Sequence, residues 1–162
     1  MKNFKAIIIL LNLVLLLVFF NLDVLKKEKV LDEGQLILLK LMPLDPRSLM
    51  QGDYMNLRYA ISATNSDEEF SKRGYCIVKL DENGVAEKVR LQESVEPISS
   101  GEYAISYTTR KWHGINIGAE SYFFQEGEGE KYEEAKYGGI KVDGNGNSLL
   151  IGLYDENRVL IE

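Results

Sequence analysis

Apolar residues are concentrated at the start of the chain and are spread out afterwards. Residues 6–22 form an unbroken run whose only polar members are Asn12 and Asn21, and Lys2 and Lys5 precede it. At a rise of ~1.5 Å per residue, a helix of this run is about 25 Å long, and the apolar residues that follow extend it to about 30 Å. The pattern therefore predicts a transmembrane helix.

Two alternatives to a membrane anchor fit the run less well. A cleaved signal peptide needs small residues before the cleavage site, and residues 21–26 contain none. A buried core helix shows an apolar stripe, whereas this run is apolar all round. We therefore expect residues 1–25 to form an uncleaved signal anchor and residues 26–162 to form a single β-rich domain.

The basic residues that flank the run bear on its orientation. Lys2 and Lys5 lie before it, and Lys26, Lys27 and Lys29 lie after it, so the count of positive charges is nearly even. A short basic tail ahead of the first helix is the usual arrangement of a signal anchor. We therefore predict a single-pass membrane protein whose domain lies on the extracytoplasmic side.

After residue 33 the pattern changes to short segments that alternate apolar and polar positions between glycines. Such punctuation is typical of strands and turns. The sequences DENG (81–84) and DGNGN (143–147) lie between such segments and predict two β-hairpins. The strands that we expect cover residues 35–42, 54–62, 75–80, 85–91, 103–112, 115–125, 139–143, 148–154 and 158–161.

Helical signals are few in this part of the chain. Asp45 and Pro46 favour a single turn that ends at Gly52, and a second short helix is expected from Gly129 to Tyr137, before two glycines. The fold class is therefore mainly β. We expect a compact antiparallel β domain with one or two short helices, preceded by an N-terminal transmembrane helix.

The composition narrows the range of functions. The chain has 25 acidic and 19 basic residues and a net charge of −6, which disfavours a nucleic-acid partner because phosphate binding needs a basic face. The single cysteine, Cys76, excludes an internal disulfide and a cysteine zinc cluster. The single histidine, His113, argues against a histidine-rich metal site. We therefore expect no cofactor, and no residue set identifies a reaction.

The most specific local pattern is GDYMNLRY, residues 52–59. It resembles the motif of the bacterial GDYXXLXY proteins, which are small, membrane-anchored and of unassigned molecular function. The matching residues are Gly52, Asp53, Tyr54, Leu57 and Tyr59. The resemblance extends from about Gln35 to Leu153 and includes residues 120–135. It implies a membrane location, and it implies a multi-pass membrane protein as partner, because members are commonly encoded beside such proteins.

The motif has a structural reading that needs no ligand. Gly52 can take a left-handed conformation that ends a turn, and Asp53 can accept hydrogen bonds from backbone N–H groups. A strand then begins at Tyr54. Because alternate residues of a strand share a face, Leu57 and Tyr59 pack inward while Tyr54 points to the other side.

The motif also has a functional reading, which the residues alone leave open. In this reading Asp53, Tyr54 and Arg58 form an exposed patch that docks a partner. Aromatic and arginine residues are the side chains that most often anchor protein interfaces. The whole motif is therefore a candidate structural or docking site.

The segment LMQGDY, residues 49–54, also resembles the stretch that follows the nucleophile in signal-peptidase-like serine-lysine proteases. The position of their nucleophile is occupied here by Leu44, and Ser48 lies where they carry a non-nucleophilic threonine. A lysine base such as Lys79 or Lys88 performs no acyl transfer without a nucleophile. This comparison therefore disfavours proteolysis.

The densest charge cluster is EGEGEKYEE, residues 126–134. Calcium prefers carboxylate-rich loops, so Glu126, Glu128 and Glu130 are weak candidates for a cation site. We favour a solvated helix start, because carboxylates at that position interact favourably with the helix dipole. The loop DGNGNS, residues 143–148, begins like a calcium loop but lacks its glycine and final glutamate, so we expect a hairpin turn there.

Trp112 and His113 complete the set of candidates, as a pair at a strand end that can line a pocket. The favoured function is that of a membrane-anchored β domain that acts as an interaction or accessory component for a membrane or envelope protein. The alternative is a hydrolase or a ligand-binding sensor domain that uses the carboxylates of residues 126–134, or Trp112 and His113.

Overall fold

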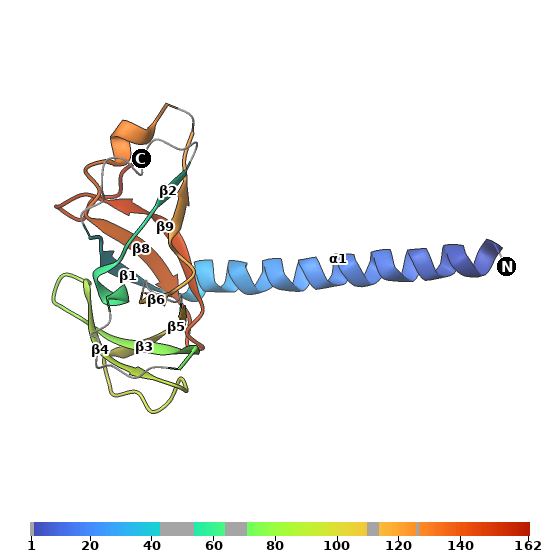
Figure 1. The fold of residues 1–162 in the computed structure, drawn as a ribbon, viewed down its shortest axis with the longest axis horizontal. Coiled ribbons are helices and arrows are strands. Elements are labelled where there is room, and N and C mark those ends of the chain that lie inside the picture. Colours follow the sequence, from blue (N-terminus) through green and yellow to red (C-terminus); the bar gives the residue numbers. More distant parts are fainter. Residues whose placement is uncertain (1, 43–53, 64–70, 110–113, 126) are drawn as a thin grey trace.

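The structure is a computed structural model of the 162-residue chain, and it describes all residues except 1, 43–53, 64–70, 110–113 and 126. A long N-terminal helix, α1 (Lys2–Glu33), leads into a group of β sheets that lies across its end (Figure 1). Within the described residues, two short 3-10 helices, η2 (Ala60–Ser62) and η3 (Gly129–Tyr132), interrupt the strands. The predicted fold class, mainly antiparallel β after an apolar helix, is confirmed.

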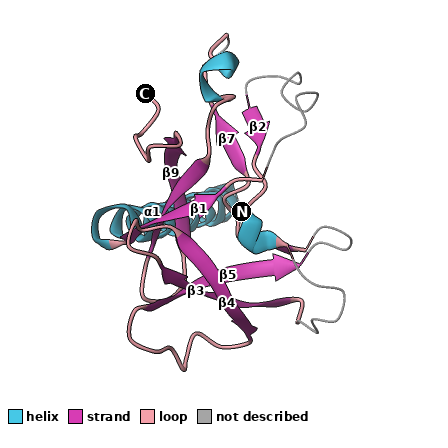
Figure 2. Cartoon of the chain, turned by 90° about the vertical axis from the view of Figure 1, so that its left-hand side faces the viewer, coloured by secondary structure: helices cyan, strands magenta, loops and turns pink. Residues whose placement is uncertain are grey.

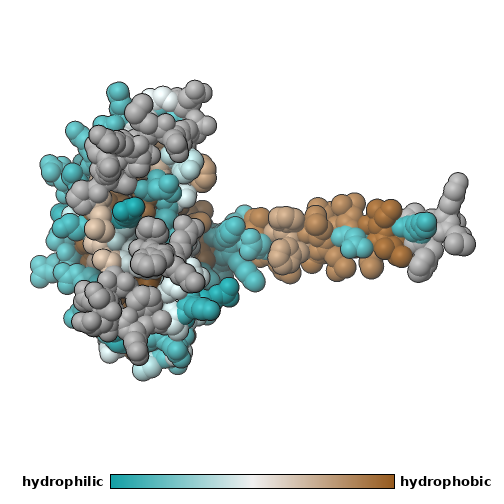
Figure 3. Space-filling view, viewed as in Figure 1, coloured by the Kyte–Doolittle hydropathy of each residue, from teal (hydrophilic) through white to brown (hydrophobic). Residues whose placement is uncertain are grey.

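The helix α1 is exposed all round over residues 7–25, and it forms an apolar rod that projects from the sheets (Figure 3). In the described part of the chain, one helix is long and apolar enough to cross a membrane, and it is this one. The two asparagines within the apolar run donate to the helix itself: the amide of Asn12 donates to the Ile8 carbonyl at 3.2 Å, and that of Asn21 donates to the Leu17 carbonyl at 2.8 Å. These polar groups therefore need no partner outside the helix.

The strands that the structure describes form three antiparallel sheets. One sheet has the order β1-β8-β9, from β1 (Gln35–Lys40), β8 (Tyr137–Val142) and β9 (Ser148–Tyr154). A second has the order β4-β3-β5-β6, from β4 (Ala86–Gln92), β3 (Arg73–Leu80), β5 (Glu102–Thr109) and β6 (Ile115–Asn116). The third is a two-stranded ribbon of β2 (Tyr54–Asn56) and β7 (Ser121–Phe123).

The hairpins β3–β4 and β8–β9, predicted from DENG and DGNGN, are confirmed. Each turn begins with an aspartate, Asp81 or Asp143, whose carboxylate accepts hydrogen bonds of 2.8–2.9 Å from the N–H groups two and four residues later. The fourth position of each turn has a positive φ, which is 76° at Gly84 and 82° at Gly146. Glycine adopts this conformation without steric cost, so these turns form readily.

A third turn of the same kind follows β9. The backbone N–H of Asp155 donates to the Val159 carbonyl at 3.0 Å, and the Asp155 carboxylate accepts the Val159 N–H at 2.8 Å. Arg158 occupies the fourth position, where the other two turns have glycine, and its φ is 64°. Among the described residues it is the one non-glycine residue with a positive φ. Beyond this turn, residues 158–161 form a single bridge, Tyr154 to Leu160, instead of the predicted strand.

The predicted strand 54–62 is shorter than expected, because β2 ends at Asn56 and η2 begins at Ala60. The alternation of faces nevertheless persists through the irregular part. The buried residues are Met55, Leu57, Tyr59 and Ile61. The exposed residues between them are Tyr54, Asn56, Arg58 and Ala60. The predicted strand 115–125 is likewise divided into β6 and β7, with Gly118 between them at a φ of 83°.

The predicted helix from Gly129 to Tyr137 is wrong beyond its first turn, since η3 ends at Tyr132 and Tyr137 begins β8. The reason lies in the two glycines that follow. A Cβ at Gly138 would lie 2.8 Å from Cε1 of Tyr59, and a Cβ at Gly139 would collide with the ring of Tyr154. The glycines therefore form a strand whose bare backbone receives two tyrosine rings, and this packing outweighs the local helical signal.

The core lies between the three-stranded and four-stranded sheets, because the largest cluster of buried side chains draws on both. From the first sheet it takes Ile37, Leu39, Ile140 and Leu153. From the second it takes Cys76, Val78, Ile105 and Tyr107. The motif residues Met55, Leu57 and Tyr59 join the same cluster. The segment that carries the motif is therefore part of the fold's core on one of its faces.

A single residue, Gly34, separates α1 from β1. Val30, in the last turn of the helix, is 5% exposed, and its carbonyl accepts the N–H of Gly34 at 3.0 Å. A Cβ at Gly34 would collide with that carbonyl and would lie 3.2 Å from the Cβ of Lys141 on β8. Since α1 also contacts β8 and β9, the end of the helix is packed against the sheet and is not linked to it by a loose tether.

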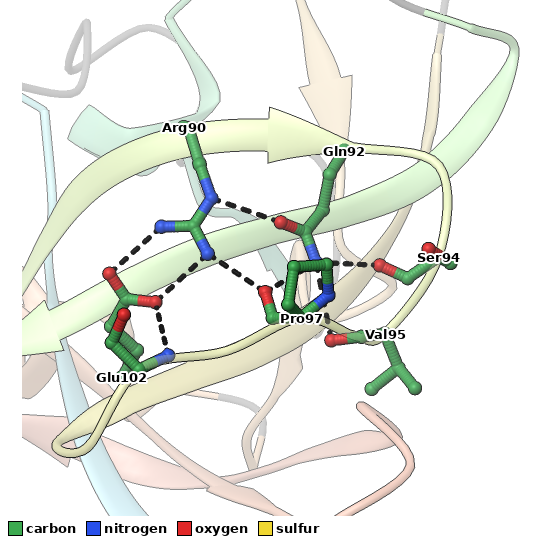
Figure 4. A network of polar contacts seen from close by, with 7 residues as sticks. Arg90, Gln92, Ser94, Val95, Pro97 and Glu102 are labelled. Atoms are coloured by element: carbon green, nitrogen blue, oxygen red, sulfur yellow. Dashed lines mark hydrogen bonds and ion pairs between the residues drawn. The ribbon is translucent and has the colours of Figure 1, made fainter.

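A polar network covers the outer face of the four-stranded sheet (Figure 4). Ile77 is fully buried on the face opposite to the core, and its cross-strand partner on β4 is Arg90. The guanidinium of Arg90 donates to both carboxylate oxygens of Glu102, on β5, at 2.8 and 2.9 Å, and also to the Pro97 carbonyl at 3.0 Å. The N–H of Ser99 donates to the same carboxylate at 2.9 Å. The network therefore fixes the loop between β4 and β5 over an apolar side chain.

Candidate functional site

The last tyrosine of the motif is a structural residue. The Tyr59 side chain is fully buried, and its hydroxyl donates a hydrogen bond to the carbonyl oxygen of Ala119 at 2.5 Å. Its ring lies against Gly138 on β8. Burial, with the nearby charge of Glu120 as a smaller cause, raises the pKa of Tyr59 well above its usual range. Tyr59 therefore ties the motif segment to β8 and to the chain before β7.

The first tyrosine of the motif faces the other way. Tyr54 is 39% exposed on β2, and its cross-strand partner on β7 is Phe123, which is 73% exposed. The two rings lie 5.8 Å apart, between centroids, at an interplanar angle of 38°. The structure therefore brings Tyr54 together with an aromatic residue that the sequence reading did not single out, and together they form an exposed aromatic pair.

The ribbon that carries this pair lies toward the side of the sheets from which α1 leaves (Figure 1). Figure 2 shows β2 and β7 side by side and displaced from the axis of α1. Figure 1 shows β2 slanting toward the side of the sheets from which α1 leaves. Arg58 follows on the same exposed face, two residues after Asn56. Gly52 and Asp53 of the motif lie outside the described residues.

The acidic candidates show a surface arrangement. Glu128 is half-buried and Glu130 is exposed, and both lie at the start of η3. The ammonium of Lys131 lies 3.9 Å from the carboxylate of Glu128 and 5.8 Å from the ring centroid of Tyr132. Among the described residues, no group of three or more histidine, cysteine, aspartate or glutamate side chains is placed to hold a metal ion. Glu126 lies outside those residues.

The remaining candidates lie outside the described part of the chain. Trp112 and His113, the pair proposed for a pocket, belong to residues 110–113. Leu44 and Ser48, which bear on the protease comparison, belong to residues 43–53. The hydrolase and sensor alternatives therefore have no described geometry at these positions.

A groove of about 440 Å³ lies at the turn that joins β3 to β4. Its charged lining comes from Lys40, Asp81, Glu87, Lys88 and Arg158, and η2 contributes Ala60 and Ile61. The ammonium of Lys88 donates to the Ala63 carbonyl at 3.0 Å. The sequence reading missed this site. Comparing the three turn sequences DENG, DGNG and DENR, in which Arg158 replaces a glycine, would have drawn attention to it.

Comparisons with known proteins agree with the motif. Neither the comparison with curated proteins nor the comparison with solved structures gives a match. The family model described as GDYXXLXY protein matches residues 16–153, which include most of α1, the motif and every strand up to β9. The chain therefore belongs to the GDYXXLXY family.

Proposed function

We propose that this protein is a membrane-anchored interaction domain that serves as an accessory component of a multi-pass membrane protein. The observation that supports this best is the direct passage from α1 into β1, with Val30 packed among the sheets. An anchor joined in this way holds the sheets at a fixed place beside the bilayer. A partner that is itself embedded in the membrane is always within reach of such a domain.

The docking surface in this proposal is the ribbon of β2 and β7, with the aromatic pair Tyr54 and Phe123 and the nearby Arg58. Phe123 is 73% exposed, although phenylalanine side chains are usually buried in a folded protein. Aromatic and arginine side chains are enriched at the centres of protein interfaces. The ribbon is displaced from the axis of α1 (Figure 2), so a partner bound there lies to one side of the anchor helix.

The sheets lie on the extracytoplasmic side in this proposal. The two lysines of the short N-terminal tail then remain in the cytoplasm, as is usual for a signal anchor. A reporter enzyme that is active only outside the cytoplasm, fused after Glu162, should be active. An inactive reporter, together with a fluorescent cytoplasmic reporter at the same position, would reverse the orientation.

Site-specific photo-crosslinking in native membranes tests the docking surface. A photoreactive residue at position 54 or 123 should give an adduct with a multi-pass membrane protein. The matched control is position 156, which is exposed in the turn after β9, and it should give none. Adducts of equal yield from all three positions, or adducts with soluble proteins only, would contradict the proposal.

A further inference from the structure

We propose that the groove lined by Lys40, Lys88 and Arg158, called the Arg158 groove below, binds a small dianionic ligand, either a phosphate ester or a dicarboxylate. The inference is independent of the docking surface on the ribbon of β2 and β7. It rests on one backbone observation and on the charges that surround it.

The backbone observation is the conformation of Arg158. The turns that begin at Asp81 and Asp143 have a glycine at the fourth position, where φ is positive. The turn that begins at Asp155 has the same backbone hydrogen bonds, and its carboxylate also accepts the N–H four residues later, but an arginine stands at the fourth position, at a φ of 64°. A side chain at such a φ costs free energy that glycine does not. Strained residues of this kind cluster at functional sites.

The charges around Arg158 indicate what kind of ligand the groove binds. Its side chain lines the groove together with Lys40 of β1 and Lys88 of β4, so three cations from distant parts of the sequence meet there. Two carboxylates, Asp81 and Glu87, line the same groove. One oxygen of Asp81 is already occupied by the N–H groups of its own turn, which reduces its competition for the cations.

The volume of the groove and its apolar lining residues indicate the kind of ligand. A volume of about 440 Å³ falls in the range of small-molecule sites, which is roughly 300–1,000 Å³. Ile61, Val85 and Ala86 provide apolar surface between the charged residues. A compact molecule with two negative charges and a short carbon skeleton fits this lining. Arginine and lysine together favour both carboxylate and phosphate oxygens.

A structural alternative makes a different prediction. Arg158 lies near enough to Asp81 for its positive charge to contribute, as a minor cause, to a lowered pKa of that carboxyl group. The chief cause is hydrogen bonding from the N–H of Val85. If Arg158 were kept only to brace the two turns against each other, its replacement by glycine would weaken the fold. If it is kept for a ligand, the same replacement should stabilise the fold.

The test uses the full chain in a mild detergent, with melting temperatures measured in chloride, inorganic phosphate or succinate at equal ionic strength. Phosphate or succinate should raise the melting temperature of the unmodified protein above its value in chloride. Arg158→Gly should melt at a higher temperature in chloride, and its affinity for the probe should be weaker by roughly tenfold or more. Lys40→Gln should also weaken the probe's effect, and Lys72→Gln, outside the groove, should retain it.

The two probes show whether the ligand carries a phosphate group or two carboxylates. A response to phosphate alone indicates a phosphate ester, a response to succinate alone indicates a dicarboxylate, and a response to both indicates a site for either dianion. The inference is overturned if neither probe raises the melting temperature, or if Arg158→Gly keeps the full response. A lower melting temperature of Arg158→Gly in chloride would assign Arg158 to the structural alternative.

Discussion

Replacing Tyr59 with phenylalanine removes one hydroxyl from the middle of the core and changes little else. The ring remains against Gly138, and the apolar contacts of a fully buried side chain are kept. The hydrogen bond to the Ala119 carbonyl is lost, and Ala119 is itself only 3% exposed, so water cannot readily replace the donor. Leaving a buried acceptor without its partner costs about 1–3 kcal/mol. We expect Tyr59→Phe to lower the free energy of unfolding by this amount.

Urea unfolding of the full chain in a mild detergent, followed by the circular dichroism of the β sheets, measures the effect. A loss of about 2 kcal/mol moves the midpoint by roughly 1 M of urea if the slope is about 2 kcal/mol per M. The matched control is Tyr54→Phe, which removes a hydroxyl from an exposed ring and should change the free energy by less than about 0.5 kcal/mol. Equal midpoints for the two variants would refute the reasoning.

The same hydroxyl gives a dependence on pH. Because burial raises the pKa of Tyr59 above its value of about 10 in the unfolded chain, folding favours the protonated form. The contribution of this group to stability is therefore complete below pH ~10 and declines as the pH rises further. The difference in urea midpoint between the unmodified protein and Tyr59→Phe should shrink above pH ~10. A difference that stays constant up to pH 12 would contradict this assignment.

Three further predictions concern other parts of the molecule. Gly138→Ala should destabilise the fold by about 1–3 kcal/mol in urea, because the new Cβ meets the Tyr59 ring at 2.8 Å; Gly144→Ala, with open space around it, should not. Hydrogen bonds from Arg90 hold the pKa of Glu102 at about 2, below its value in the unfolded chain. The unmodified protein should therefore be more stable than Glu102→Gln above pH ~4.5, and this difference should vanish toward pH 2. An unchanged difference at pH 2 would contradict this. The full-length chain should stay in the membrane fraction after carbonate extraction, and release of the intact chain would exclude an anchor.

Local signals in the sequence predict the parts of the fold that depend on neighbouring residues. The turns DENG and DGNGN predict two hairpins, because an aspartate that accepts N–H groups and a glycine at positive φ suffice to reverse the chain. The alternation of residues 54–61 predicts which side chains of the motif are buried, even where β2 has ended. These features need no knowledge of the distant chain.

Other features depend on contacts between distant residues, and a single sequence does not reveal them. Tyr137 and Gly138 read locally as the end of a helix, but they begin β8, and the ring of Tyr59 lies on Gly138. The same limit applies to the candidate docking surface. The motif itself points to Tyr54, whereas Phe123 becomes its neighbour only through the pairing of β2 with β7. Arg158 is different, because comparison of the three turn sequences is enough to find it.

The single-residue junction at Gly34 has a mechanical consequence. Because the last turn of α1 packs against β8, the helix and the sheets move as one rigid body and not as two parts joined by a flexible linker. Rotation of α1 about its own axis then moves the ribbon of β2 and β7 along an arc around that axis, and a tilt of α1 shifts the ribbon along with it. If the ribbon docks a membrane partner as proposed, that partner meets α1 from one side only, and a rotation of the helix changes the direction that the docking surface faces.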